Sequence, residues 1–281
     1  MHIIEESSFY DIAYEPKSYV SKLMNDFWPG AMTLVVNKKP DLPKWLGGHT
    51  SMFLNTVGIR MPANKTARDL IKSSKRILAA PSANVAGKPS PTKAEHVLSD
   101  FKDSQMDIPV IDGEEVSFGL ESTVIDVTAD LPCILRPGQI TADDIIKSTG
   151  LQPVQGYVSA DTPRSPGQKY KHYAPDAPLV LVSGDIENRV NYIKNSTNEK
   201  RTGVLIHSGS AEFYKDLPGN CIVIKAGETK NEIAQNLFHL LREFDKLKVE
   251  QIFAEDVSVD GYGEAIMDRL KKAAGGRIIH V

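Results

Sequence analysis

Apolar and polar positions follow two different patterns along the chain. In the first half, the apolar side chains of residues 17–27 fall on one helical face, and Trp28-Pro29-Gly30 ends the predicted helix. Asn64 and Thr141 are predicted N-caps, and Thr92 with Glu95 forms a capping-box pattern for a helix that runs to about Leu98. The expected strands are Met32–Asn37, Met52–Met61, Ile77–Ala80, Ile108–Asp112, Ser122–Val127 and Cys133–Leu135. Because these runs are mixed with turns and do not alternate regularly with helices, we expect an α+β domain with a twisted mixed sheet.

From Pro178 onward, strand-like and helical stretches alternate regularly. The clearest helix carries an apolar stripe made of Ile233, Leu237, Leu240, Leu241 and Phe244. The strand-like runs are Leu179–Val182, Gly203–His207, Ile222–Lys225, Gln251–Ala254 and Arg277–Val281. This alternation predicts a small, parallel, doubly wound α/β sheet. No glycine-rich phosphate-binding motif accompanies it, so we assign no nucleotide to this part of the chain.

Residues 151–175 separate these two patterns. Four prolines interrupt any helix there, and little periodicity remains. We therefore expect a first domain over residues 1–150, a linker or lid over 151–177, and a second domain over 178–281. A chain of 281 residues is long enough for two such domains.

Composition narrows the class of protein. With 41% hydrophobic residues, 25% charged residues and a formal net charge of −3, the chain has no overall electrostatic attraction to nucleic acid or membrane, so any RNA contact is expected to be weak and local. Cys133 and Cys221 lie far apart, which excludes a disulfide framework and a cysteine-rich zinc site. No stretch approaches the length of a membrane span, and we expect a cytoplasmic protein.

The segment Leu78–Thr92 (LAAPSANVAGKPSPT) carries the most information about function. An apolar run leads directly into small hydroxyl, amide and glycine residues, the composition of a loop that lets a ligand approach the backbone. Alone, such a segment also suits ordinary turns. Around it, in fixed order, stand Phe27–Val36 (FWPGAMTLVV), Thr56–Pro62 (TVGIRMP), Glu121–Asp126 (ESTVID), Leu135–Thr141 (LRPGQIT) and Ser165–Pro175 (SPGQKYKHYAP).

Together these motifs resemble the threonylcarbamoyl-AMP synthase family, in its long form with a second C-terminal domain. The resemblance covers nearly the whole chain and implies that residues 1–150 form a YrdC-like catalytic domain. The family places a Lys-x-Arg motif and its first strands and helices upstream of a His-Ile pair, whereas this chain starts at Met1-His2-Ile3. We therefore expect an N-terminally incomplete catalytic domain, nearly inactive and prone to aggregation, with His2 as a frayed terminus.

The resemblance implies a nucleotidyltransferase that joins L-threonine, bicarbonate and ATP. Its products are threonylcarbamoyl-adenylate and pyrophosphate, the first step toward the t6A base of tRNA, and the tRNA-modification machinery takes the intermediate. Mg2+ is expected to accompany the ATP. Adenylate transfer depends on positioning and on stabilisation of phosphate charge, so we assign no catalytic nucleophile.

Three residues are assigned to L-threonine by the resemblance. Arg60 is a cation inside an apolar strand, where it needs a carboxylate or phosphate partner, and the family implies the threonine carboxylate. The alternative is a structural ion pair with a protein Asp or Glu. Ser122 is implied as a hydroxyl donor, since no Gly-x-Ser-x-Gly elbow supports a serine hydrolase. His2 matches a histidine of the family that contacts threonine.

A larger set is assigned to ATP. Ser82 and Asn84 are two residues apart, so in an extended segment they point to the same side, although a Ser or Asx turn also explains them. Thr92 can cap a helix or place a phosphate at its N-terminus. Family resemblance adds Thr56, Arg136, Tyr170, His172 and Tyr173, the last three as part of a cationic and aromatic lid that includes Lys169 and Lys171. Their alternatives are β-propensity for Thr56, an exposed strand end for Arg136, and a solvated tether for the lid.

Two departures from the family pattern and two competing hypotheses remain. Ala86 stands where the family usually has Ser, and Glu114 stands where it has a second Gly. The main alternative is a catalytically impaired nucleotide- or RNA-binding remnant of the same fold. The carbamoyltransferase of hydrogenase maturation is set aside, because two isolated cysteines cannot supply its zinc fingers.

Overall fold

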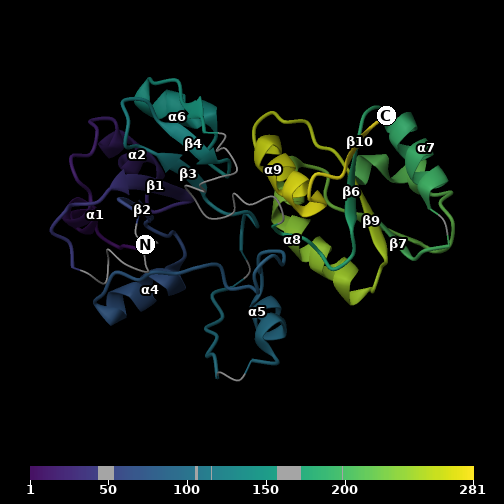
Figure 1. Ribbon diagram of the computed structural model, residues 1–281, viewed down its shortest axis with the longest axis horizontal. Helices are drawn as coiled ribbons and strands as arrows, with labels where there is room; N and C mark the ends of the chain where they lie inside the picture. The colour runs from purple at the N-terminus through teal and green to yellow at the C-terminus, as the bar shows by residue number, and fades with distance from the viewer. Residues whose placement is uncertain (44–53, 105–106, 115, 157–171, 198) are drawn as a thin grey trace. The chain divides into compact units, whose positions relative to one another are not determined.

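The chain forms two compact units, each built from two separate stretches of sequence. Unit 1 comprises Met1–Pro81 and Glu121–Gln168, and unit 2 comprises Ser82–Leu120 and Lys169–Val281 (Figure 1). The structure is a computed structural model that describes residues 1–43, 54–104, 107–114, 116–156, 172–197 and 199–281. The boundaries expected at residues 150 and 177 stay a prediction, and each unit is described by itself.

Unit 1 contains a five-stranded mixed sheet in the order β2-β1-β3-β4-β5. Its strands are β1 Met32–Asn37, β2 Thr56–Ile59, β3 Thr123–Asp126, β4 Cys133–Arg136 and β5 Val154–Gln155. β1 pairs antiparallel with β2 and parallel with β3, while β4 pairs antiparallel with β3 and parallel with β5. This arrangement is the mixed sheet expected from the irregular spacing of the apolar runs.

Four described helices belong to unit 1: α1 Glu6–Ile12, α2 Val20–Phe27, α4 Lys65–Ser74 and α6 Ala142–Thr149. The predicted caps are present, because Asn64 accepts a hydrogen bond from the Ala67 N–H and Thr141 forms a capping box with Asp144. The apolar faces of α1, α2 and α6 pack with the core strands in one cluster that includes Phe9, Leu23, Leu34, Ile125 and Ile145. One face of the sheet therefore packs against these helices in a shared apolar core.

Unit 2 contains a five-stranded, all-parallel sheet in the order β10-β6-β9-β7-β8. Its elements after residue 178 are β6 Leu179–Ser183, α7 Ile186–Ser196, β7 Thr202–Ile206, the 3-10 helix η2 Ser208–Tyr214, β8 Cys221–Lys225, α8 Lys230–Lys246, β9 Gln251–Glu255, α9 Gly263–Ala274 and β10 Ile278–His280. One core lies under α8 and α9, and another lies under α7 and η2. Helices on both faces confirm the predicted doubly wound fold. Among the described helices, none is both long and apolar enough to cross a bilayer.

Three local predictions for residues 77–112 are wrong. Ile77–Ala80 is not a strand: among the described residues it makes a single bridge, between Leu78 and His2. Ile108–Asp112 is not a strand, and Ile111 is 63% exposed, so its apolar run finds no sheet partner among the described residues. The helix α5 Ala94–Phe101 begins without a capping box. In a capping box the Thr92 N–H would donate to the Glu95 side chain. Here it donates to His96 Nδ1 at 3.1 Å.

Candidate active site

Arg60 follows β2 and is held in place mainly through its backbone. Its N–H donates to the Met1 carbonyl at 2.9 Å, and its carbonyl accepts from the Ile3 N–H at 3.0 Å. Its side-chain Nε donates to the Gly30 carbonyl at 2.8 Å. No carboxylate of the described residues forms an ion pair with this guanidinium, so the structural ion pair considered as the alternative is not found there. In the part of the chain that the structure describes, its two terminal nitrogens have no partner and can bind an anion.

The surroundings of Arg60 disfavour its charge. Burial, followed by the positive charge of Arg136, lowers the pKa of Arg60 to about 10. Two guanidinium groups that repel each other in a partly buried place are stabilised when an anion binds between or beside them. Arg60 is therefore suited to bind a carboxylate or a phosphate.

Ser122, immediately before β3, is fixed by two neighbours. Its Oγ lies 2.8 Å from the Thr33 Oγ1 of β1, where either hydroxyl can donate. Arg136, at the end of β4, donates from Nε and Nη2 to the Ser122 carbonyl at 3.2 and 2.9 Å, and from Nη2 to Ser122 Oγ at 3.3 Å. Ser122 and Arg136 are only 4% and 8% exposed. Arg136 is thus a buried residue that orients Ser122, and the predicted alternative of an exposed strand-end arginine is wrong.

Gly138 lets the segment after β4 approach the Ser122 backbone closely. A Cβ at this position would lie 2.4 Å from the Thr123 N and 2.7 Å from the Glu121 carbonyl oxygen. Both of these atoms are backbone and cannot rotate away. The glycine of the Leu135–Thr141 motif is therefore required by packing against the Ser122 loop.

His2 is paired on both sides, so the expectation of a frayed terminus is wrong. It forms isolated bridges with Arg60 and with Leu78, and its N–H donates to the Leu78 carbonyl at 2.7 Å. Burial lowers the pKa of His2 to about 4, assisted by the positive charges of the N-terminus and Arg60. At neutral pH the imidazole is uncharged and can either donate or accept a hydrogen bond.

One sheet face carries the polar members of this group. Thr56 opens β2 opposite Asn37, and along β2 the core residues Val57 and Ile59 alternate with half-buried positions. Thr56, Gly58 and Arg60 therefore share the face that does not enter the core. A Cβ on Gly58 would meet the Thr33 side chain at 3.3 Å, which places Thr33 on the same face. The sequence analysis did not include Thr33 among the site residues. The signal that could have found it is a hydroxyl side chain inside the apolar run MTLVV.

Unit 2 contains the residues of the Leu78–Thr92 segment that were assigned to ATP. Ser82 is exposed. Asn84 is half-buried, and its Nδ2 donates to the carbonyls of Val85 and Lys88 at 2.9 and 3.2 Å, whereas its Oδ1 is buried without a hydrogen-bond partner. Thr92 is buried, and its N–H is already bonded to His96. Asn84 thus closes the loop by itself and still presents one unsatisfied acceptor.

The predicted lid is only partly described. Lys169, Tyr170 and Lys171 lie outside the described residues. Tyr173 is 1% exposed in the core of unit 2, where its ring centroid lies 5.0 Å from that of Phe238 and 5.9 Å from the Arg269 guanidinium carbon. His172 packs edge-on against Tyr173. In this conformation the Tyr173 ring packs inside the protein core and is not exposed to a ligand.

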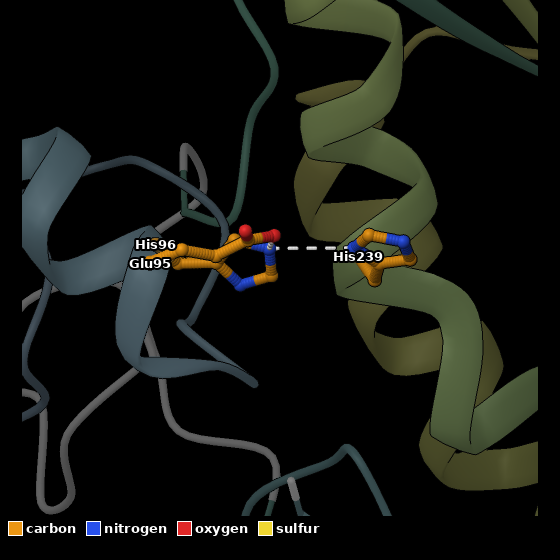
Figure 2. A group of neighbouring side chains, drawn as sticks. All are labelled: Glu95, His96 and His239. Carbon is orange, nitrogen blue, oxygen red and sulfur yellow. Dashed lines mark hydrogen bonds and ion pairs between the residues drawn. The ribbon is translucent and has the colours of Figure 1, made fainter. Parts of the chain in front are cut away.

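Two histidines and a glutamate form a cluster between α5 and α8, where metal ligation has to be considered (Figure 2). His96 Nε2 lies 3.3 Å from His239 Nδ1, and Glu95 is the third member. The Thr92 backbone N–H can only donate, so His96 Nδ1 must accept and the proton of neutral His96 sits on Nε2. A metal at Nε2 would need an imidazolate or the loss of the Thr92 hydrogen bond. Nitrogen ligands also do not suit Mg2+, and the cluster is better explained as a hydrogen-bonded histidine pair.

Comparison with known proteins identifies the family. A family model described as "Telomere recombination" matches residues 2–138, and one described as "Threonylcarbamoyl-AMP synthase, C-terminal domain" matches residues 140–275. The chain is 40% identical over 289 residues to a threonylcarbamoyl-AMP synthase of Pyrococcus abyssi, covering 100% of this chain and 81% of that protein. The chain belongs to the threonylcarbamoyl-AMP synthase family.

Other members of the family agree. The threonylcarbamoyl-AMP synthase of Bacillus subtilis is 41% identical over 283 residues, which cover 99% of this chain and 80% of that protein. The crystal structure of P. abyssi Sua5 complexed with L-threonine superposes with a TM-score of 0.85 at 39% identity, over 100% of this chain and 81% of that one. These matches confirm the predicted family, the two-domain α/β fold and the synthase function. The roles of individual residues stay predictions.

Proposed function

We propose that unit 1 binds the amino-acid substrate through Arg60, Ser122 and His2. Arg60 carries this proposal, because it is a partly buried cation with no carboxylate partner among the described residues and with both terminal nitrogens available. L-threonine offers the carboxylate that such a guanidinium binds in a bidentate manner. Ser122 Oγ and the neutral His2 ring then supply hydrogen bonds to the polar groups of the same molecule. The related P. abyssi protein crystallised with L-threonine supports this choice of ligand.

We further propose that ATP binds through the Leu78–Thr92 segment, with Ser82 and the free Asn84 Oδ1 as its first contacts. Thr56, Thr92, Arg136, Tyr170, His172 and Tyr173 complete the predicted set. For Arg136, Thr92 and Tyr173 a direct contact requires that existing contacts to Ser122, His96 and Phe238 be given up or shared. Arg136 is therefore better assigned to orienting Ser122 beside the threonine site.

Bicarbonate completes the reaction, which releases pyrophosphate and gives threonylcarbamoyl-AMP for the tRNA-modification machinery. Mg2+ is proposed to arrive on the ATP phosphates, since the nitrogen-rich cluster of Glu95, His96 and His239 does not fit it. This chain's own contribution is to bind the threonine carboxylate, to orient the reacting groups and to neutralise charge. We propose a cytoplasmic location because the two cysteines of the chain, Cys133 and Cys221, lie far apart in sequence and offer no disulfide framework.

Product formation from the three substrates tests the proposal. Purified protein is incubated with L-threonine, bicarbonate and ATP, and pyrophosphate release is measured together with threonylcarbamoyl-AMP. Release should require all three substrates, and Arg60→Ala should strongly reduce this threonine-dependent release. Binding of ATP without any adenylate product would instead support the alternative of a nucleotide-binding remnant.

A further inference from the structure

Arg242 of α8 and Asp100 of α5 form a buried ion pair in unit 2. Arg242 Nη1 donates to Asp100 Oδ1 and Nη2 donates to Oδ2, both at 2.8 Å, which is a bidentate arrangement. The two side chains are each 8% exposed. Although burial opposes it, the hydrogen bonds and charge of Arg242 hold the pKa of Asp100 below its ordinary value.

Both partners also contact the backbone of the loop that contains Asn84. Arg242 Nη2 donates to the Pro89 carbonyl at 2.5 Å, and Asp100 Oδ2 accepts from the Val85 N–H at 3.4 Å. Asn84 itself bonds to the carbonyls of Val85 and Lys88. The ion pair therefore holds the loop at two points, one on each side of Lys88.

A second group of contacts ties the middle of the same loop to the C-terminal part of the chain. The Gly87 carbonyl accepts from the Ala174 N–H at 2.8 Å. Lys88 forms an ion pair with Asp176 and lies 3.9 Å from Asp245 of α8. Residues 85–89 are thus held by α5, by α8 and by the segment just before β6.

A buried ion pair is weak evidence for stability, because removing two charges from water costs about as much as their attraction returns. Such a pair does restrict geometry, since a bidentate guanidinium has one arrangement that satisfies both carboxylate oxygens. Here that arrangement also satisfies two backbone groups of a loop. A positioning role for this loop explains the observed contacts better than stability alone.

We propose that Arg242 and Asp100 are positioning residues for the nucleotide loop, so that α8 takes part in ATP binding by fixing the backbone that carries Ser82 and Asn84. This inference rests on the proposed assignment of that loop to ATP. It adds a part for the C-terminal α/β domain, to which the sequence assigned no nucleotide. Neither residue needs to touch the substrate.

Steady-state kinetics of Arg242 variants test the positioning role. Arg242→Lys keeps the charge but loses the two-pronged geometry, and Arg242→Met removes both. We expect the ATP KM to rise about tenfold to hundredfold, as misplaced binding groups commonly cause, while the threonine KM changes less than about twofold. The control is Asp260→Asn, which removes an 81% exposed carboxylate from its ion pair with Lys230 in the same unit and should leave both constants unchanged. Equal changes in both KM values for Arg242→Lys, or no change in either, would overturn the proposal.

Amide hydrogen exchange provides a readout that does not depend on turnover. In the ligand-free protein, the amides of residues 85–88 and of Ser90 should exchange at least about tenfold faster in Arg242→Lys than in wild type, while those of β6 and β9 stay protected. Unchanged exchange at these amides would show that the ion pair does not hold the loop and would overturn the proposal. If wild-type protein forms no threonylcarbamoyl-AMP, the proposed function fails. The exchange result and the dissociation constant for ATP then still decide whether Arg242 positions this loop.

Discussion

The guanidinium of Arg136 donates two hydrogen bonds, of 3.2 and 2.9 Å, to the backbone carbonyl of Ser122. Through this contact the last residue of β4 controls where the main chain before β3 lies. The Ser122 hydroxyl, bonded to Thr33, is then presented from a fixed backbone. We therefore expect Arg136 to act on the site through Ser122, although the family resemblance had assigned it to ATP.

Replacing Arg136 with lysine tests that relationship. Lysine keeps the charge but cannot place two N–H donors on one carbonyl, and an under-satisfied buried carbonyl costs about 1–3 kcal/mol. Arg136→Lys should lower the unfolding midpoint of the protein and raise the threonine KM more than the ATP KM. A rise in the ATP KM alone would return Arg136 to a nucleotide contact.

Arg60→Ala should mainly weaken the use of threonine. Loss of a desolvated ion pair to a carboxylate typically costs about 2–5 kcal/mol, so kcat/KM for threonine should fall accordingly, with little change in the dissociation constant for ATP. Arg68→Ala, at an exposed arginine of α4 in the same unit, is the matched control. If both variants use threonine as well as the wild type does, Arg60 has no part in binding it.

Gly138→Ala should disturb the Ser122 loop. The added methyl group would lie 2.4 Å from the Thr123 N, so either the backbone shifts or the residue is strained, at about 1–3 kcal/mol of unfolding free energy. Gly219→Ala adds the same methyl group where nothing lies within 4 Å. Unfolding midpoints and threonine KM values of the two variants are compared. Equal stability and equal KM would mean that the close approach at Gly138 is not required.

His96 predicts how the stability of unit 2 depends on pH. Burial, then the positive charges of Arg242 and His239, lowers the pKa of His96 to about 4, although Glu95 acts in the opposite direction. Lys246 adds a further small lowering. An unfolded histidine titrates near pH 6.5, so between about pH 6.5 and 4 the unfolded chain binds a proton that the folded chain does not. The free energy of unfolding should therefore decrease as the pH falls through this window.

Thermal unfolding at pH 7 and pH 5 checks this expectation. The difference between the two midpoints should be smaller in His96→Asn than in wild type, because asparagine can still accept the Thr92 N–H and cannot titrate. His280→Asn, at an exposed histidine of β10, should leave the difference unchanged. His2 contributes in the same direction in all three proteins, since its pKa is also lowered to about 4. Identical pH dependence in wild type and His96→Asn would contradict the assignment.

Local sequence patterns predicted much of the fold because their causes are local. Asn64 and Thr141 cap helices through bonds that span three residues, and the apolar run Met32–Asn37 matches β1. The Ile108–Asp112 run failed because a strand also needs a neighbour, which local propensity does not supply. Likewise, Thr92 has a side chain that commonly caps helices, but its backbone N–H donates to His96, four residues later.

The candidate site was predictable where a motif names the residue, and unpredictable where distant residues meet. Arg60 and Ser122 were predicted in that way, and their roles stay predictions. The pairing of Arg242 with Asp100 spans 142 residues, and nothing in either local pattern signals it. Tyr173 lies in a segment whose cationic and aromatic residues suggested a lid, but its ring is buried in the core of unit 2.

Because unit 2 is built from two separate stretches of sequence, its parts are synthesised at different times. Residues 82–120 leave the ribosome early, whereas their ion-pair partner on α8 follows 142 residues after Asp100. At 5–20 residues per second, that interval is roughly 7–28 s. During it, a nascent chain carries α5 with the carboxylate of Asp100 still facing water. The loop of residues 85–89 can take its final shape only after α8 has been translated.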